Sequence, residues 1–138
     1  MSDIHSAQQT LVDEFDFFDD WMDKYQYIID LGKQLPSFPD EWKTDANKIT
    51  GCQSQVWIHH ELNDGKIKLF AISDAAIVSG LIALLLKVYD NRTPQEILTT
   101  EPVFLTQLGL DKHLSPTRSN GLHSMLQRIA ELAKHYSI

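Results

Sequence analysis

The sequence contains a single cysteine, Cys52, among its 138 residues. A lone thiol excludes a disulfide within the chain, and it also excludes a zinc or iron–sulfur site built from several cysteines of one chain. Whatever Cys52 does, it does without a second thiol of its own chain. Because an isolated cysteine is commonly a small buried apolar residue, composition by itself favours a structural role for it.

Basic residues and long hydrophobic runs are also scarce. The 12 lysines and arginines are scattered and outnumbered by 19 acidic residues, so no basic stripe is present to bind a nucleic acid. The longest nearly continuous apolar run, residues 75–88, is shorter than the roughly 20 residues that span a bilayer. The first nine residues carry no basic segment followed by an apolar one, as a signal peptide would. We therefore expect a cytoplasmic protein with neither a membrane nor a nucleic acid as partner.

An apolar content of 43% is enough to build a core. We expect one domain over residues 1–138, with residues 1–9 flexible. Apolar residues at helical spacing predict one long helix over residues 10–33 and a terminal helix that begins after Ser115, an N-cap followed by proline. The buried faces are expected to carry Leu11, Phe15, Phe18, Met22, Tyr25 and Ile29 in the first of these helices, and Leu122, Met125, Ile129, Leu132 and Tyr136 in the second.

The middle of the chain predicts a β-hairpin followed by helices. Residues 55–62 alternate, with Val56, Ile58 and Leu62 on the buried side, and residues 66–72 form the return strand after a tight Asn-Asp-Gly turn. Residues 48–49 are expected to add a third short strand. The segment 75–89, apolar on nearly all sides, predicts a buried helix capped by Ser73 or Asp74.

Two breaks by proline then predict short helices over residues 94–98 and 103–108. The fold class is therefore α+β, with helices on one face of a small antiparallel sheet of about three strands.

Cys52 lies in a polar segment directly before the first predicted strand, not within an apolar period. Gly51 gives the backbone conformational freedom there, so the turn is suited to presenting a thiol to another protein. Gly51, Gln53, Ser54 and Gln55 are candidates for loop geometry and docking, and the alternative is an ordinary polar turn. The six histidines show no metal-ligand spacing, so we expect no metal site.

Three segments carry a resemblance to the SufE family, which includes the CsdE-type proteins. Residues 51–57, Gly-Cys-Gln-Ser-Gln-Val-Trp, resemble its cysteine loop. Residues 73–82 resemble the start of its central helix, and residues 113–122 the segment that opens its final helix. The Leu-Pro and Phe-Pro pairs at residues 35–39 also agree, so the resemblance extends from about residue 11 to residue 133.

The resemblance implies a fold shared with IscU-type scaffold proteins and a role in iron–sulfur cluster assembly. Cys52 would accept sulfur as a persulfide from a cysteine desulfurase similar to SufS or CsdA and pass it to an iron–sulfur scaffold or another acceptor. Pyridoxal phosphate would belong to the desulfurase, and this chain would bind no cofactor. The absence of a second thiol favours a carrier, since a neighbouring thiol would attack the persulfide and release sulfide.

Arg118, in the last of these segments, is a candidate to support the Cys52 thiolate if the fold brings the two together. The alternative is a salt bridge on the helix surface. Two other function classes remain open. In one, Cys52 is the nucleophile of a thiol hydrolase with a histidine base; in the other, the chain regulates a desulfurase by binding alone.

Overall fold

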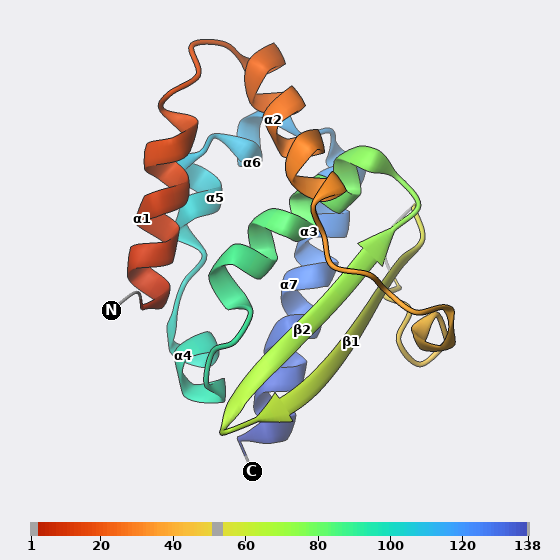
Figure 1. Ribbon diagram of the computed structural model, residues 1–138. Helices are drawn as coiled ribbons and strands as arrows, with labels where there is room; N and C mark the ends of the chain where they lie inside the picture. The colour runs from red at the N-terminus through yellow and green to blue at the C-terminus, as the bar shows by residue number, and fades with distance from the viewer. Residues whose placement is uncertain (1–2, 51–53, 138) are drawn as a thin grey trace.

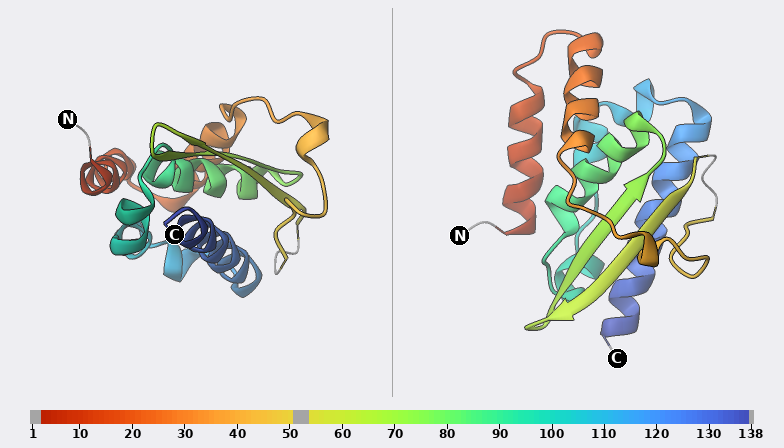
Figure 2. Two further views of the ribbon diagram at one scale, coloured as in Figure 1. Left: turned by 90° about the horizontal axis from the view of Figure 1, so that it is seen from below. Right: turned by 45° about the vertical axis from the view of Figure 1, so that its right-hand side comes forward.

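The structure is a computed structural model that describes residues 3–50 and 54–137 (Figure 1). In chain order its elements are α1 (Ile4–Phe15), α2 (Trp21–Lys33), the 3₁₀ turn η1 (Asp40–Trp42), β1 (Val56–Asn63), β2 (Lys66–Ser73), α3 (Ala76–Tyr89), α4 (Pro94–Thr99), α5 (Val103–Gln107), α6 (Leu110–His113) and α7 (Pro116–Tyr136). The predicted fold class is confirmed, with α3 and α7 on one face of the β-hairpin (Figure 2).

The hairpin and its turn form where the sequence predicts them. Asn63 pairs with Lys66, and the two residues between them, Asp64 and Gly65, have φ angles of 53° and 78°. Positive φ at both central positions is the backbone of a tight two-residue turn. Of the residues expected to face the core, Leu62 does not, since it lies next to the hairpin tip and is 50% exposed.

The third strand is reduced to a single bridge between Lys48 and Trp57, so the sheet in the described part of the chain has two strands. The Ile49 N–H donates to the Val56 carbonyl at 2.9 Å, and the Ile58 N–H donates to the Asn47 carbonyl at 2.9 Å. Pairing cannot extend beyond Asn47, because its own N–H already closes a turn onto the Thr44 carbonyl at 3.1 Å.

The long N-terminal helix was a wrong prediction, since two antiparallel helices take its place (Figure 1). Asp20 begins the second one, and its Oδ1 accepts from the Asp23 N–H at 2.9 Å. The Tyr27 hydroxyl of α2 donates to the Glu14 carboxylate of α1 at 2.6 Å. Burial, together with this carboxylate, raises the pKa of Tyr27 to about 12, so the phenol stays a donor.

α3 is the central helix of the molecule, and it is buried on nearly all sides as predicted. Its cap differs from the prediction, because the N-cap is Ala75, whose side chain accepts no hydrogen bond. Ser73 Oγ instead accepts from the Ala75 N–H at 3.2 Å. Asp74 Oδ1 accepts from the Gln55 N–H at 3.1 Å and so joins the start of β1 to the end of β2.

The two faces of the hairpin hold adjacent histidines in different surroundings. On the outer face, His59 stacks on Trp42 with ring centroids 3.7 Å apart. On the helix face, His60 Nδ1 lies 2.7 Å from the Tyr136 hydroxyl of α7. The outward positions of β1 are thus covered by the segment that follows α2, not by the terminal helices.

α2 and α3 cross with their backbones in contact at two glycines. A Cβ added to Gly32 would lie 2.6 Å from the Gly80 nitrogen, and one added to Gly80 would overlap the Ile28 carbonyl oxygen. Real Cβ atoms do not approach backbone atoms this closely, so only glycine fits both positions without moving a helix.

We therefore expect Gly80→Ala to lower the free energy of unfolding by about 1–3 kcal/mol, because overpacking outweighs the gain in helix propensity. Urea denaturation measures this difference. Lys87→Ala, an exposed position on the same helix, is the control and should change stability by less than about 0.5 kcal/mol. A Gly80→Ala protein as stable as the control would contradict the close contact.

The second prediction concerns His60. Burial, with smaller contributions from His59, His135 and Arg128, lowers the pKa of His60 below its ordinary 6.5. As the pH falls through 6.5, the unfolded chain therefore takes up this proton before the folded one, and stability declines. We expect His60→Gln to lose less stability than the wild type between pH 7.5 and pH 5, measured by urea denaturation at each pH. Equal losses would show that His60 is not responsible.

Candidate functional site

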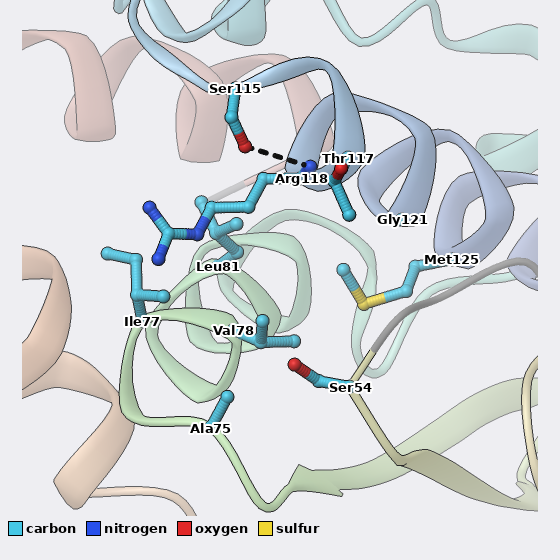
Figure 3. A pocket seen from close by; sticks show the side chains of 10 residues that line it. All are labelled: Ser54, Ala75, Ile77, Val78, Leu81, Ser115, Thr117, Arg118, Gly121 and Met125. Carbon is cyan, nitrogen blue, oxygen red and sulfur yellow. Dashed lines mark hydrogen bonds between the residues drawn. The ribbon is translucent and has the colours of Figure 1, made fainter.

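A cleft of about 400 Å³ opens where the described chain resumes at Ser54 (Figure 3). Its walls come from the start of the β1 segment, the first half of α3 and the first half of α7. The lining residues are Ser54, Ala75, Ile77, Val78, Leu81, Ser115, Thr117, Arg118, Gly121 and Met125.

The three segments that carry the family resemblance meet at this cleft. Ser54 comes from residues 51–57, four lining residues come from residues 73–82, and four more come from residues 113–122. Only Met125 lies outside these segments, and it reaches into the cleft from α7 toward Ser54 (Figure 3). Three segments far apart in the sequence thus form one site.

Asp74 fixes the chain at the edge of the cleft. Its carboxylate accepts from the Gln55 N–H, and its own N–H donates to the Gln55 carbonyl at 3.3 Å. These two bonds continue the pairing of β1 with β2 by one residue beyond Val56 and Ser73. The position of Ser54 therefore depends on the hairpin, which is a rigid element.

Arg118 is an exposed cation at the rim, in the first turn of α7. Its Nη1 donates to the Tyr25 hydroxyl of α2 at 3.2 Å, and its own N–H donates to Ser115 Oγ, the cap of α7, at 3.3 Å. The described residues show Arg118 bound to a phenol, not to the carboxylate that a surface salt bridge would need. This contact holds the guanidinium beside the cleft.

Positive and apolar groups line the cleft together, and the Asp74 carboxylate lies at its edge. Both α3 and α7 begin here, since Ala75 and Ser115 are their N-caps, and a helix carries partial positive charge at its N-terminus. Arg118 adds a full positive charge, and its guanidinium lies beside Ile77 (Figure 3). Apolar side chains of α3 and α7, namely Ile77, Val78, Leu81 and Met125, form the rest of the wall.

The predicted site residues divide into two groups. Ser54 lies half-buried in the cleft, Gln55 is exposed at its edge, and Arg118 stands at its rim. Gly51, Cys52 and Gln53 lie outside the described residues.

One residue that lines the cleft, Met125, and one that supports its rim, Tyr25, had been assigned to the core by periodicity. Met125 and Tyr25 were expected on buried helix faces, and helical spacing cannot show that such a face borders a cleft or that Tyr25 reaches Arg118. Ala75 could have been found from its place in residues 73–82, which resemble a family segment.

Within residues 3–50 and 54–137, no group of three or more His, Cys, Asp or Glu side chains is placed to hold a metal ion. Two of the histidines lie against aromatic rings, His59 on Trp42 and His113 on Trp21. None of the helices in the same part of the chain is both long enough and apolar enough to cross a membrane.

Comparison with known proteins identifies the family. Residues 9–133 match the SufE family, described as an Fe-S metabolism associated domain. An uncharacterized SufE-like protein of Rhizobium etli is 43% identical over 129 residues, which cover 90% of this chain and 87% of that protein. A second uncharacterized SufE-like protein, from Rhizobium meliloti, is 40% identical over 129 residues, covering 90% of this chain and 92% of that protein.

A solved structure shows the same fold. The solution structure of a hypothetical protein from Thermus thermophilus superposes with a TM-score of 0.77 at 20% identity, covering 94% of this chain and 95% of that one. The chain belongs to the SufE family, and the predicted family is thereby confirmed.

Proposed function

We propose that Cys52 accepts sulfur as a persulfide from a pyridoxal-phosphate cysteine desulfurase, stimulates that enzyme by clearing its persulfide, and hands the sulfur to an iron–sulfur scaffold. The observation that supports this function is the convergence of all three family-like segments on one cleft with a cationic rim. The family's association with Fe–S metabolism agrees with it.

Cys52 is joined to the cleft by a short stretch of chain. Two peptide units separate it from Ser54, and consecutive Cα atoms are about 3.8 Å apart. Ser54 itself lines the cleft. This short tether supports the proposal that the thiol acts at the cleft.

The transfer is a displacement at sulfur that needs no oxidant or reductant. The Cys52 thiolate attacks the outer sulfur of the desulfurase persulfide, a new S–S bond forms, and the S–S bond of the donor breaks. The donor cysteine leaves as a thiolate and takes up a proton, while Cys52 carries the sulfur as a persulfide. Cleavage of the C–S bond of free cysteine, and the pyridoxal phosphate that permits it, belong to the partner.

The electrostatics of the cleft suit both anions in this step. A fixed cation and helix N-termini favour a thiolate over a thiol, and they favour a persulfide anion in the same way. Arg118 and the starts of α3 and α7 supply these charges. The apolar side chains that line the cleft would shelter the bound sulfur from water and from other thiols.

The lining of the cleft also bears on the competing functions. A thiol hydrolase needs a histidine base within hydrogen-bond reach of its sulfur, and no histidine is among the described residues that line the cleft. A purely regulatory adaptor would work without the thiol. Substitution of Cys52 separates that case from a carrier.

The test is incubation with a cysteine desulfurase and free cysteine. Mass spectrometry should show about 32 Da added on Cys52, the mass of one sulfur atom. Cys52→Ser should carry no adduct and should lose the stimulation of the desulfurase. A wild-type protein without the adduct would overturn the carrier function, and stimulation that survives in Cys52→Ser would favour the adaptor.

Arg118 gives a separate prediction. We expect Arg118→Gln to raise the pKa of the Cys52 thiol, because a cation that favours the thiolate is lost, and Arg118→Lys to keep most of the effect. The pH dependence of alkylation of Cys52 measures this pKa. Lys134→Gln, which removes the same charge from an exposed position in the last turn of α7, is the control and should leave the profile unchanged. Equal profiles for Arg118→Gln and the control would contradict the role of Arg118.

A further inference from the structure

Two large apolar side chains stand almost fully in solvent at the turn between α1 and α2. Phe17 is 88% exposed and Met22 is 83% exposed. Met22, together with Trp21, Tyr25 and His113, lines a depression of about 240 Å³. We call these five residues, Phe17, Trp21, Met22, Tyr25 and His113, the turn patch.

Trp21 and Tyr25 are partly buried against the core, but Phe17 and Met22 are almost fully exposed. The buried residues of α2 are Ile28 and Leu31. In the turn, Phe18 packs against Tyr27 with ring centroids 5.0 Å apart, whereas Phe17 points into solvent. Exposed apolar residues that gather around a depression are typical of a surface that another protein covers. Aromatic residues and methionine are also the residue types enriched in the centres of such interfaces.

The turn patch is continuous with the functional cleft. Trp21 stacks on His113 at the end of α6, with ring centroids 4.0 Å apart and an interplanar angle of 21°. One turn further along α2, Tyr25 accepts the hydrogen bond from Arg118 at the rim of the cleft. Both surfaces are thus built on the same face of α2, beside α6 and the start of α7 (Figure 1).

Acidic residues outnumber basic ones along the turn and the start of α2. Asp16, Asp19, Asp20 and Asp23 are all exposed there. Two basic groups also touch the patch, since Lys24 Nζ lies 5.3 Å from the centroid of the Trp21 ring and Arg118 bonds to the Tyr25 hydroxyl. A complementary partner therefore presents lysines or arginines around an apolar socket.

We propose that the turn patch is a second docking site for the cysteine desulfurase, which contacts it through a basic face with an apolar socket while its persulfide meets Cys52. This inference rests on the proposed function, because it is that function which supplies a protein partner at the adjoining cleft. The patch strengthens binding of the partner and takes no part in the transfer of sulfur.

The experiment compares Phe17→Ser/Met22→Ser with the wild type in the stimulation of a cysteine desulfurase as the concentration of this protein is varied. We expect the half-saturating concentration to rise at least about tenfold, since exposed aromatic and apolar anchors carry much of the binding free energy of an interface. Maximal stimulation and the final persulfide mass on Cys52 should be unchanged. Added salt should raise the half-saturating concentration of the wild type, because the aspartates are exposed.

Leu62→Ser is the matched control. The hairpin tip lies at the opposite end of the molecule from the turn between α1 and α2 (Figure 1). Leu62, next to this tip in the sequence, is 50% exposed, and its substitution should leave the half-saturating concentration unchanged. Urea denaturation of each variant establishes that it is folded.

The outcomes distinguish the two proposals. A wild type that takes no sulfur overturns the proposed function and the docking site with it. A wild type that takes sulfur, with a double variant of unchanged half-saturation, overturns the docking site alone. A wild type that is dimeric by sedimentation and a double variant that is monomeric would assign the patch to a second copy of this chain and likewise overturn the docking site.

Discussion

The backbone contact between α2 and α3 at Gly32 and Gly80 is the constraint on which much of the arrangement depends. It sets how closely the two helices lie and, with that, where each end of α2 is placed. The N-terminal half of α2 then meets α6 and α7, where Tyr25 reaches Arg118. The C-terminal end directs the following segment across the outer face of the hairpin, where Trp42 covers His59. A wider crossing of α2 and α3 would move Tyr25 away from Arg118 and Trp42 away from His59.

The charge of the cleft arises from chain topology more than from composition. The protein is acidic overall, with a formal charge of −7, yet two helices begin at the same place and an arginine stands between them. A local positive field in a negative protein favours an anion at that place while leaving the remaining surface acidic. The turn patch shows the opposite combination, apolar side chains with aspartates around them. The two proposals therefore assign the binding of a partner and the stabilisation of an anion to neighbouring surfaces of different character.

The parts of the fold that were predicted from the sequence are those with local causes. The Asp64–Gly65 turn, the Ser115 cap and the buried α3 each follow from a few adjacent residues, and each is present in the structure. The break between α1 and α2 was missed because apolar residues continue at helical spacing across the turn, as Phe15, Phe18 and Met22 do. The prediction that Asp74 could cap α3 was wrong, because its carboxylate accepts from the N–H of Gln55, directly before β1, and not from its own helix.

The residues of the candidate site were also predicted only in part. The resemblance selected Ser54, Gln55 and Arg118, and the structure places the first and the last of these at one cleft. Met125 and Tyr25 could not be selected, because their place at the site depends on how distant helices pack. Cys52 lies outside the described residues, so its role remains a prediction.

The hydrogen bond from Ile49 to the Val56 carbonyl closes the base of the segment that carries the thiol. From that base, three residues lead to Cys52, and at about 3.3–3.6 Å per extended residue the backbone can carry the cysteine no farther than roughly 10 Å. In the proposed function, delivery of sulfur is thus short in range. A donor and a recipient would each have to bring their own reactive atom close to the same small area of the surface, and they could do so only one after the other.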